Sequence, residues 1–154
     1  MKIMFVCHGN ICRSPMAEFI FKDILKRKGL EKHFTVTSSA TSTEEIYCGV
    51  GNPVYPPAKR ILNEHGISCA GKRAVLFTKQ DYDKYDIILV MDSNNMRNIM
   101  RIVGADTQNK IHKLLDLCGG GDVADPWYSG DFECCYNDIE RGCNALLMQL
   151  IKET

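Results

Sequence analysis

The chain has 154 residues, of which 45% are hydrophobic and 25% are charged. These values are close to the averages for folded soluble proteins, and the length predicts one domain spanning residues 1–154. Nineteen Lys and Arg side chains balance nineteen Asp and Glu side chains. The chain therefore has no excess charge to recruit nucleic acid or an anionic membrane, and any anion must bind locally.

Patterns of secretion and of membrane insertion are both missing from the sequence. The apolar stretch that starts at Ile3 ends at Cys7, which is too short for the core of a signal peptide. No other run approaches the roughly 20 apolar residues of a membrane-spanning helix. We therefore expect a cytoplasmic protein with no membrane partner.

Eight cysteines raise the alternatives of a disulfide framework or a zinc site. Disulfide frameworks mostly serve chains too small to build a hydrophobic core, whereas this chain has long periodic apolar segments. Structural zinc sites usually show a C-x-x-C pair, and this sequence has none. We expect most of the thiols to be reduced and buried, with no metal and no other cofactor.

Predicted strands and helices alternate along the chain. Short apolar, β-branched runs predict strands at residues 2–6, 34–37, 86–91 and 110–115. Apolar residues at helical spacing predict helices at residues 15–28, 57–65, 93–104 and 132–152. Ser93 is expected to cap the third helix. This order predicts an α/β fold with three layers, in which helices cover both faces of a four-stranded parallel sheet.

The segment from Cys7 to Ser14 lies between the first strand and the first helix. In such folds ligands bind beyond the carboxyl ends of the strands. Backbone N–H groups that curl into a helix N-terminus form a cradle for a tetrahedral oxyanion. We therefore expect a phosphate loop after the first strand, with these residues around the anion: His8, Gly9, Asn10, Ile11, Cys12, Arg13 and Ser14.

Cys7 is the candidate nucleophile at the base of this cradle. The helix dipole and the guanidinium of Arg13 both favour a thiolate over a thiol, and Arg13 can hold two equatorial oxygens of a phosphoryl group. Ser14 can donate a hydrogen bond to the sulfur. A Cys-x5-Arg pattern arises by chance fairly often, but here a strand precedes it and an amphipathic helix follows. The loop lacks the Gly-Lys-Ser/Thr ending of a Walker A motif.

The run from Val6 to Pro15 resembles the phosphate loop of low-molecular-weight protein tyrosine phosphatases. Further matches in the family's order are Thr37-Ser38, Gly51-Asn52-Pro53, His65-Gly66-Ile67, Asp86 through Asp92, and Asp125-Pro126-Trp127-Tyr128. The matches extend over nearly the whole chain. The resemblance implies a phosphatase that works through a cysteinyl-phosphate intermediate.

The resemblance also assigns roles to residues outside the loop. Asp125 would act as general acid and then as general base, although an Asp-Pro pair alone would be read as a turn. Asn10, Ser38 and His65 match positions that form a hydrogen-bonded network around the loop in this family. Cys12 resembles the second thiol of a redox switch that shields Cys7 by a reversible disulfide, and a small buried residue is an equal alternative.

The expected substrates are phosphotyrosine in a protein and small aryl phosphates. An apolar residue at Ile11 goes with aryl phosphates, whereas protein-arginine phosphatases typically carry threonine there. Further alternatives are an arsenate reductase, whose extra cysteine pair is missing here, and a non-catalytic phosphoanion-binding module. Inorganic phosphate would be both product and inhibitor, and a tyrosine kinase pathway is the expected source of the substrate.

The expected walls of the substrate cleft contain one departure from the family. Trp127 and Tyr128 follow Asp125 and could stack on a phenyl ring. Glu44 falls where many members have an aromatic side chain, in a segment that is longer than usual before Gly51. Tyr47 is the candidate to replace that aromatic wall.

Overall fold

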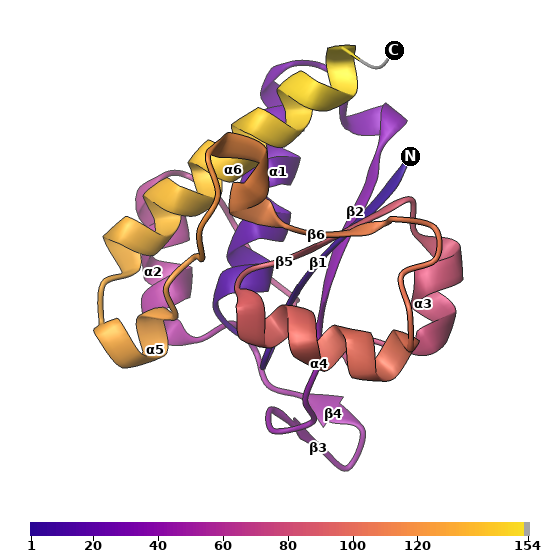
Figure 1. Cartoon of the computed structure of the whole chain (residues 1–154). Coiled ribbons are helices and arrows are strands. Elements are labelled where there is room, and N and C mark those ends of the chain that lie inside the picture. Colours follow the sequence, from indigo (N-terminus) through magenta and orange to yellow (C-terminus); the bar gives the residue numbers. More distant parts are fainter. Residues whose placement is uncertain (153–154) are drawn as a thin grey trace.

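The computed structural model describes residues 1–152, and its sheet has four parallel strands in the order β2-β1-β5-β6 (Figure 1). These strands are β1 (Lys2–Cys7), β2 (Thr35–Ala40), β5 (Ile87–Val90) and β6 (Ile111–Lys113). The helices are α1 (Arg13–Arg27), α2 (Pro56–Glu64), α3 (Lys79–Lys84), α4 (Ser93–Val103), α5 (Pro126–Ser129) and α6 (Phe132–Lys152). The predicted fold class, a four-stranded parallel sheet with helices, is confirmed.

The smaller elements lie in the connections. Two 3₁₀ helices, η1 (Glu31–His33) and η2 (Leu114–Cys118), follow α1 and β6. A two-stranded antiparallel hairpin is formed by β3 (Ile46–Tyr47) and β4 (Val50–Gly51). This hairpin occupies the long segment before Asn52 that the sequence left without structure.

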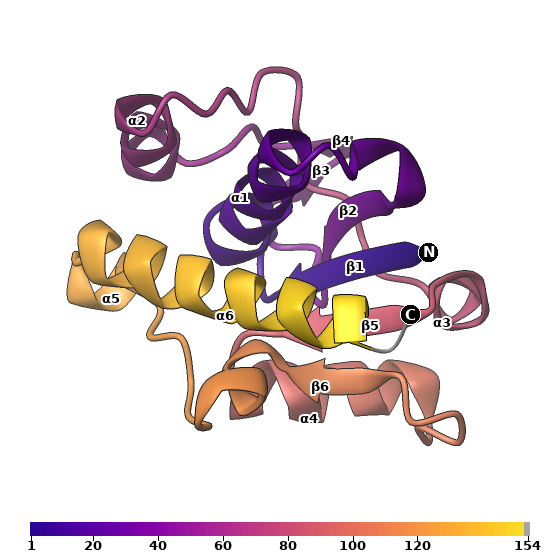
Figure 2. The ribbon, with the colours of Figure 1, turned by 90° about the horizontal axis from the view of Figure 1, so that it is seen from above.

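Side chains of β1 alternate between two hydrophobic layers. Ile3, Phe5 and Cys7 join the larger cluster with residues of α1, α2 and α6. Met4 and Val6 join the second cluster with residues of α3 and α4. The view from above shows the sheet between these helices (Figure 2). Because β1 is covered on both faces and has a strand on each side, its carboxyl end is a rigid support for the loop that follows.

Two predicted details are wrong. Asp92, not Ser93, caps α4, because its Oδ1 accepts a hydrogen bond of 2.7 Å from Asn95 N and Ser93 is already helical. The fourth strand ends at Lys113 instead of residue 115, because the chain turns there into η2. The short helix α3 was not predicted; Asp81 accepts a hydrogen bond from Thr78 N at its start. Of the helices within residues 1–152, none is long and apolar enough to cross a membrane.

Helix α6 approaches η2 closely at Gly142. A β-carbon placed on Gly142 would lie 2.5 Å from Cγ of Leu114, which is fully buried. We expect Gly142→Ala to lower the free energy of unfolding by about 1 kcal/mol, because overpacking costs about 1–3 kcal/mol and the gain in helix propensity returns about 1 kcal/mol. Urea unfolding of the wild type and the variant measures this difference in the free energy of unfolding. Asn144→Ala, at an exposed position of the same helix, is the control and should be neutral or slightly stabilising; a more stable Gly142→Ala would contradict this packing.

Candidate active site

The phosphate loop, residues 8–12, joins β1 to the N-terminus of α1. Asn10 adopts a left-handed conformation with a φ of 60°, which asparagine tolerates better than most residues. The Cys12 side chain makes no capping hydrogen bond, and the first turn of α1 contains no acidic side chain. The backbone N–H groups and the positive end of the helix dipole therefore remain available to an anion.

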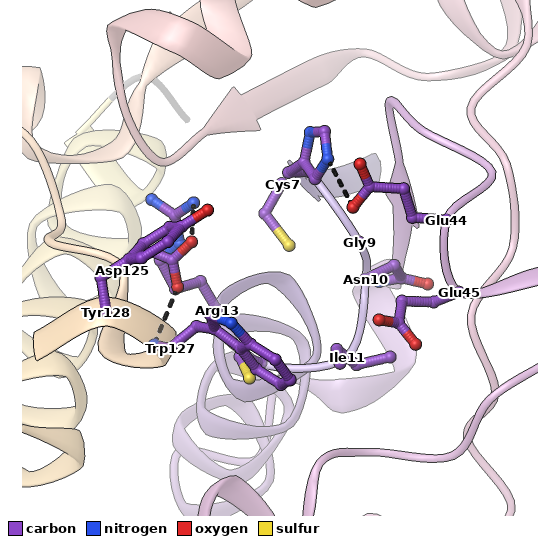
Figure 3. Close-up of a pocket in the computed structure, with 12 residues that line it drawn as sticks. Cys7, Gly9, Asn10, Ile11, Arg13, Glu44, Glu45, Asp125, Trp127 and Tyr128 are labelled. Atoms are coloured by element: carbon purple, nitrogen blue, oxygen red, sulfur yellow. Dashed lines mark hydrogen bonds and ion pairs between the residues drawn. The ribbon is translucent and has the colours of Figure 1, made fainter. Parts of the chain in front are cut away.

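Cys7 lies at the end of β1 with only 3% of its surface exposed. Its Sγ is 3.0 Å from Ser14 Oγ and 3.4 Å from Ser14 N. Figure 3 shows the sulfur pointing into the space between the phosphate loop and Asp125. The side chain thus faces the pocket and not only the hydrophobic layer behind it.

One pocket collects most of the predicted site residues from both halves of the chain (Figure 3). It is lined by Cys7, His8, Gly9, Asn10, Ile11, Cys12, Arg13, Glu44, Glu45, Asp125, Trp127 and Tyr128. Ser14 does not line the pocket but contacts the sulfur of Cys7 through its hydroxyl group. The structure therefore brings the predicted nucleophile, guanidinium and carboxylic acid to one opening.

Arg13 is 3% exposed and is held from three directions. Its Nη1 donates to Asp92 Oδ2 at 2.7 Å and to the carbonyl of Val123 at 2.9 Å, and its Nη2 lies 3.5 Å from Asp125 Oδ2. Burial lowers the pKa of Arg13, but the negative charges of Cys7, Asp92 and Asp125 outweigh burial and raise it overall. The guanidinium is therefore fixed in place and charged.

Asp92 was missed as a site residue, although it directly follows the strand that the sequence predicted most clearly. One oxygen of its carboxylate caps α4 and the other accepts from Arg13. A buried strand followed by an acidic residue at the carboxyl edge of a parallel sheet is the signal that could have found it.

Asp125 caps α5, and its Oδ1 accepts a hydrogen bond of 3.0 Å from Trp127 N. Pro126, the first residue of the helix, restricts Asp125 to an extended backbone. The other oxygen, Oδ2, faces Arg13 Nη2 at 3.5 Å, at the pocket. The carboxyl group is thus aimed at the opening above Cys7, as a proton donor to a leaving group would be.

Asn10 fixes the direction of the hydrogen bonds beneath the loop. Its Oδ1 accepts from Val75 N at 3.1 Å, so its Nδ2 provides two hydrogens, one to Ser14 Oγ at 2.7 Å and one to Ser38 Oγ at 3.0 Å. The hydroxyl of Ser14 accepts from Asn10 and keeps its own hydrogen for another partner. The shortest contact that can receive this hydrogen is Cys7 Sγ.

Glu18 and Lys72 extend this network, and both were missed. Ser38 donates to Glu18 Oε1 at 2.6 Å, and Lys72 Nζ donates to the Ser38 carbonyl at 2.9 Å while lying 3.5 Å from Glu18 Oε1. Burial lowers the pKa of Lys72, although the charge of Glu18 opposes the shift. The spacing of Ser14, Glu18 and Phe21 places Glu18 on the buried stripe of α1, but nothing in the sequence signals Lys72.

Comparisons with known proteins agree with this geometry. The family model described as low molecular weight phosphotyrosine protein phosphatase matches residues 2–154. This chain belongs to the low molecular weight phosphotyrosine protein phosphatase family.

Relatives in this family come from bacteria and animals. The chain is 38% identical to the low molecular weight protein-tyrosine-phosphatase YfkJ of Bacillus subtilis over 156 residues, covering 99% of this chain and 97% of the relative. It is 36% identical to the low molecular weight phosphotyrosine protein phosphatase of Gallus gallus over 154 residues, covering 94% of this chain and 92% of the relative.

Solved structures show the same fold along the whole chain. The crystal structure of YfkJ superposes with a TM-score of 0.93, covering 100% of this chain and 96% of that one. A structure of YwlE, described as an arginine phosphatase, superposes with a TM-score of 0.84 at 29% identity, covering 99% of this chain and 97% of that one.

The predicted cleft residues of this family member divide into two groups. Ile11, Glu44, Trp127 and Tyr128 line the pocket, and Trp127 packs against Tyr55 with ring centroids 4.8 Å apart. Tyr47 is largely exposed on β3 and is not among the lining residues. The structure therefore does not place Tyr47 as the replacement wall, because the turn of the hairpin directs it to solvent.

His65 does not join the network that the family resemblance predicted for it. It is exposed at the end of α2, and its ring stacks on Tyr136 with centroids 3.9 Å apart. The pair Glu18–Lys72, and not His65, continues the network from Asn10 and Ser38. His65 lies at the end of α2, where its ring contacts Tyr136 of α6.

Cys12 is buried in the loop that follows Cys7. Burial and the nearby charge of Cys7 raise the pKa of the Cys12 thiol, which disfavours its reactive thiolate form. All eight cysteines are free thiols, and the disulfide between Cys7 and Cys12 stays a prediction. Within residues 1–152, no group of three or more His, Cys, Asp or Glu side chains is placed to hold a metal ion.

Removing Glu18 tests the buried pair beneath the loop. Its side chain is 6% exposed and that of Lys72 12%, so we expect Glu18→Ala to lower the free energy of unfolding by about 3 kcal/mol, because the buried Lys72 loses its opposite charge and keeps only the neutral Ser38 carbonyl. Asp23→Ala, which removes the exposed pair with Arg27 on the same helix, should cost less than about 1 kcal/mol. Urea unfolding at neutral pH compares them, and equal losses would contradict the role of burial.

Proposed function

We propose that this chain hydrolyses phosphotyrosine in proteins through a cysteinyl-phosphate on Cys7. The observation that carries the proposal is the convergence of Cys7 Sγ, Arg13 and Asp125 on one pocket above the phosphate loop. Membership of the phosphotyrosine protein phosphatase family supports the reaction class. A non-catalytic phosphoanion-binding module would not need an acid aimed at the nucleophile.

In the first step the thiolate of Cys7 attacks phosphorus in line with the leaving oxygen. The new S–P bond forms as the P–O bond to the tyrosine ring breaks, and Asp125 gives its proton to the departing oxygen. Its position as the cap of α5 leaves Oδ2 at the pocket for this transfer. The products are a free tyrosine side chain and a cysteinyl-phosphate.

In the second step Asp125, now a carboxylate, takes a proton from a water molecule that attacks phosphorus. The S–P bond breaks, inorganic phosphate forms, and the electron pair returns to the sulfur of Cys7. The hydrogen bond from Ser14, which Asn10 directs towards the sulfur, stabilises the thiolate as it leaves. Inorganic phosphate fits the same cradle, so we propose that it inhibits as a product.

The charge on the equatorial oxygens is stabilised in both steps by fixed donors. These are the backbone N–H groups of the loop and the guanidinium of Arg13, which Asp92 and Val123 hold in place. Because these donors are already oriented, little reorganisation is needed in the transition state. This preorganisation is the main contribution of the protein to the rate.

Two substitutions test the roles of Cys7 and Asp125. With phenyl phosphate as substrate, Cys7→Ser should abolish turnover, and Asp125→Asn should lower kcat by about 100-fold to 10,000-fold, because the leaving phenoxide then departs without a proton. With p-nitrophenyl phosphate the loss in Asp125→Asn should be smaller, since nitrophenoxide leaves more easily. Asp116→Asn, an exposed carboxylate outside the pocket, is the control. Equal losses on both substrates would exclude Asp125 as the acid.

Arginine phosphatase activity is the second candidate, because the YwlE structure has the same fold. Ile11 favours phosphotyrosine, since its apolar side chain lines the pocket beside Trp127 and suits a phenyl ring better than a guanidinium. We expect a higher kcat/KM for a phosphotyrosine peptide than for a phosphoarginine peptide of the same sequence. Ile11→Thr should narrow the difference; a preference for phosphoarginine in the wild type would contradict the proposal.

A further inference from the structure

Glu45 is a half-buried carboxylate fixed at the mouth of the pocket. Its carbonyl accepts from Asn52 N at 2.8 Å, and its Oε2 accepts from Asn52 Nδ2 at 2.7 Å. A β-carbon placed on Gly9 would lie only 3.2 Å from Glu45 Cγ, so the side chain packs directly against the phosphate loop. Asn52, which follows β4, therefore holds Glu45 by two hydrogen bonds, and Glu45 lies beside the phosphate loop (Figure 3).

Each of the other charged side chains that line the pocket has an ionisable side chain as its partner. Arg13 is bound by Asp92 and Asp125. Glu44 lies 3.0 Å from His8 Nε2. Glu45 is different, because the partner of its carboxylate is the neutral amide of Asn52, and no ion pair joins it to a cation within residues 1–152.

An unmatched carboxylate beside a phosphate cradle repels the phosphoryl dianion of the substrate. A cation on the substrate that reaches Glu45 removes this repulsion and adds an attraction. Ile11, Trp127 and Glu45 line the same pocket. With the tyrosine ring against the apolar side chains of Ile11 and Trp127, the residues that flank the phosphotyrosine come within reach of Glu45. A lysine or arginine side chain is long enough to reach a carboxylate at that position from the adjacent residue.

We propose, on the basis of the phosphatase activity proposed above, that Glu45 selects phosphotyrosine segments with a lysine or arginine adjacent to the phosphotyrosine. Glu45 is thus a specificity-determining residue, and the substrate class is a basic phosphotyrosine segment. It acts on substrate binding through charge and takes no part in the transfer of the phosphoryl group.

Three phosphotyrosine peptides that differ only in the adjacent residue, arginine, glutamine or glutamate, test the selection. We expect kcat/KM to be about three to five times higher with arginine than with glutamate, as for a partly exposed ion pair, with glutamine between them. At 1 M salt the Debye length is about 3 Å, so the preference should largely disappear. Equal turnover of the three peptides at low salt would overturn the selection but leave phosphatase activity in place.

The substitution Glu45→Gln tests whether Glu45 acts through its negative charge or only by supporting the hairpin. Glutamine can still accept the hydrogen bond from Asn52, and it removes the negative charge. We expect the variant to lose the preference for arginine and to raise kcat/KM for p-nitrophenyl phosphate, because the dianion is no longer repelled. Glu64→Gln, an exposed carboxylate outside the pocket, should change neither quantity.

Glu45→Gln should lower the preference for arginine but raise kcat/KM for p-nitrophenyl phosphate, so a general loss of activity cannot explain both results. A fall in kcat/KM by the same factor for p-nitrophenyl phosphate and for all three peptides would mean that Glu45 only supports the hairpin, and would overturn the proposal. Absence of turnover for every peptide and for p-nitrophenyl phosphate in the wild type would overturn both this inference and the proposed function.

Discussion

The hydrogen bond between Ser14 and the sulfur of Cys7 is the interaction on which the site depends. Its direction follows from Asn10, whose oxygen is occupied by Val75 N and whose amide hydrogens go to Ser14 and Ser38. The hydroxyl hydrogen of Ser14 is left to the sulfur. A strained backbone at Asn10, with its φ of 60°, is maintained because every polar atom of its side chain has a partner.

The guanidinium of Arg13 is the second fixed point, and it connects the two halves of the sheet. It belongs to the helix after β1 but is held by Asp92, which follows β5, and by Val123 and Asp125 in the connection before α6. Asp92 couples this contact to the start of α4, because its other oxygen caps that helix. The position of the guanidinium is therefore set by the packing of β1 against β5 and not by the flexibility of an arginine side chain.

The parts of the fold that could be predicted are those governed by local patterns. Three local patterns each predict one feature: the continuous apolar run predicts the buried strand β5, the apolar stripe predicts α6, and the glycine after α1 predicts the end of that helix. The structure has all three features. The loop from Cys7 to Ser14 was also predictable, since it lies between a buried strand and a helix start. Ser93 was mistaken for the cap of α4 because serine and aspartate are both good caps, and only the backbone decides between neighbours.

The parts that could not be predicted depend on contacts between distant residues. Glu18 pairs with Lys72, which lies 54 positions later in the sequence. No local pattern around either residue predicts the other as its partner. His65 matches the family motif, yet α2 carries it to Tyr136. Tyr47 was expected at the cleft, but the turn between β3 and β4 directs it to solvent. Sequence patterns indicate which residues are unusual, whereas tertiary packing determines which of them meet.

The wide separation of the groups around Arg13 affects how the protein acquires activity. The guanidinium is separated by 110 positions from the Val123 carbonyl and by 112 from Asp125. Bringing such distant groups together requires nearly the whole chain to be ordered. During synthesis Cys7 emerges long before Asp125, so a nascent chain holds the proposed nucleophile without the proposed acid that completes the site.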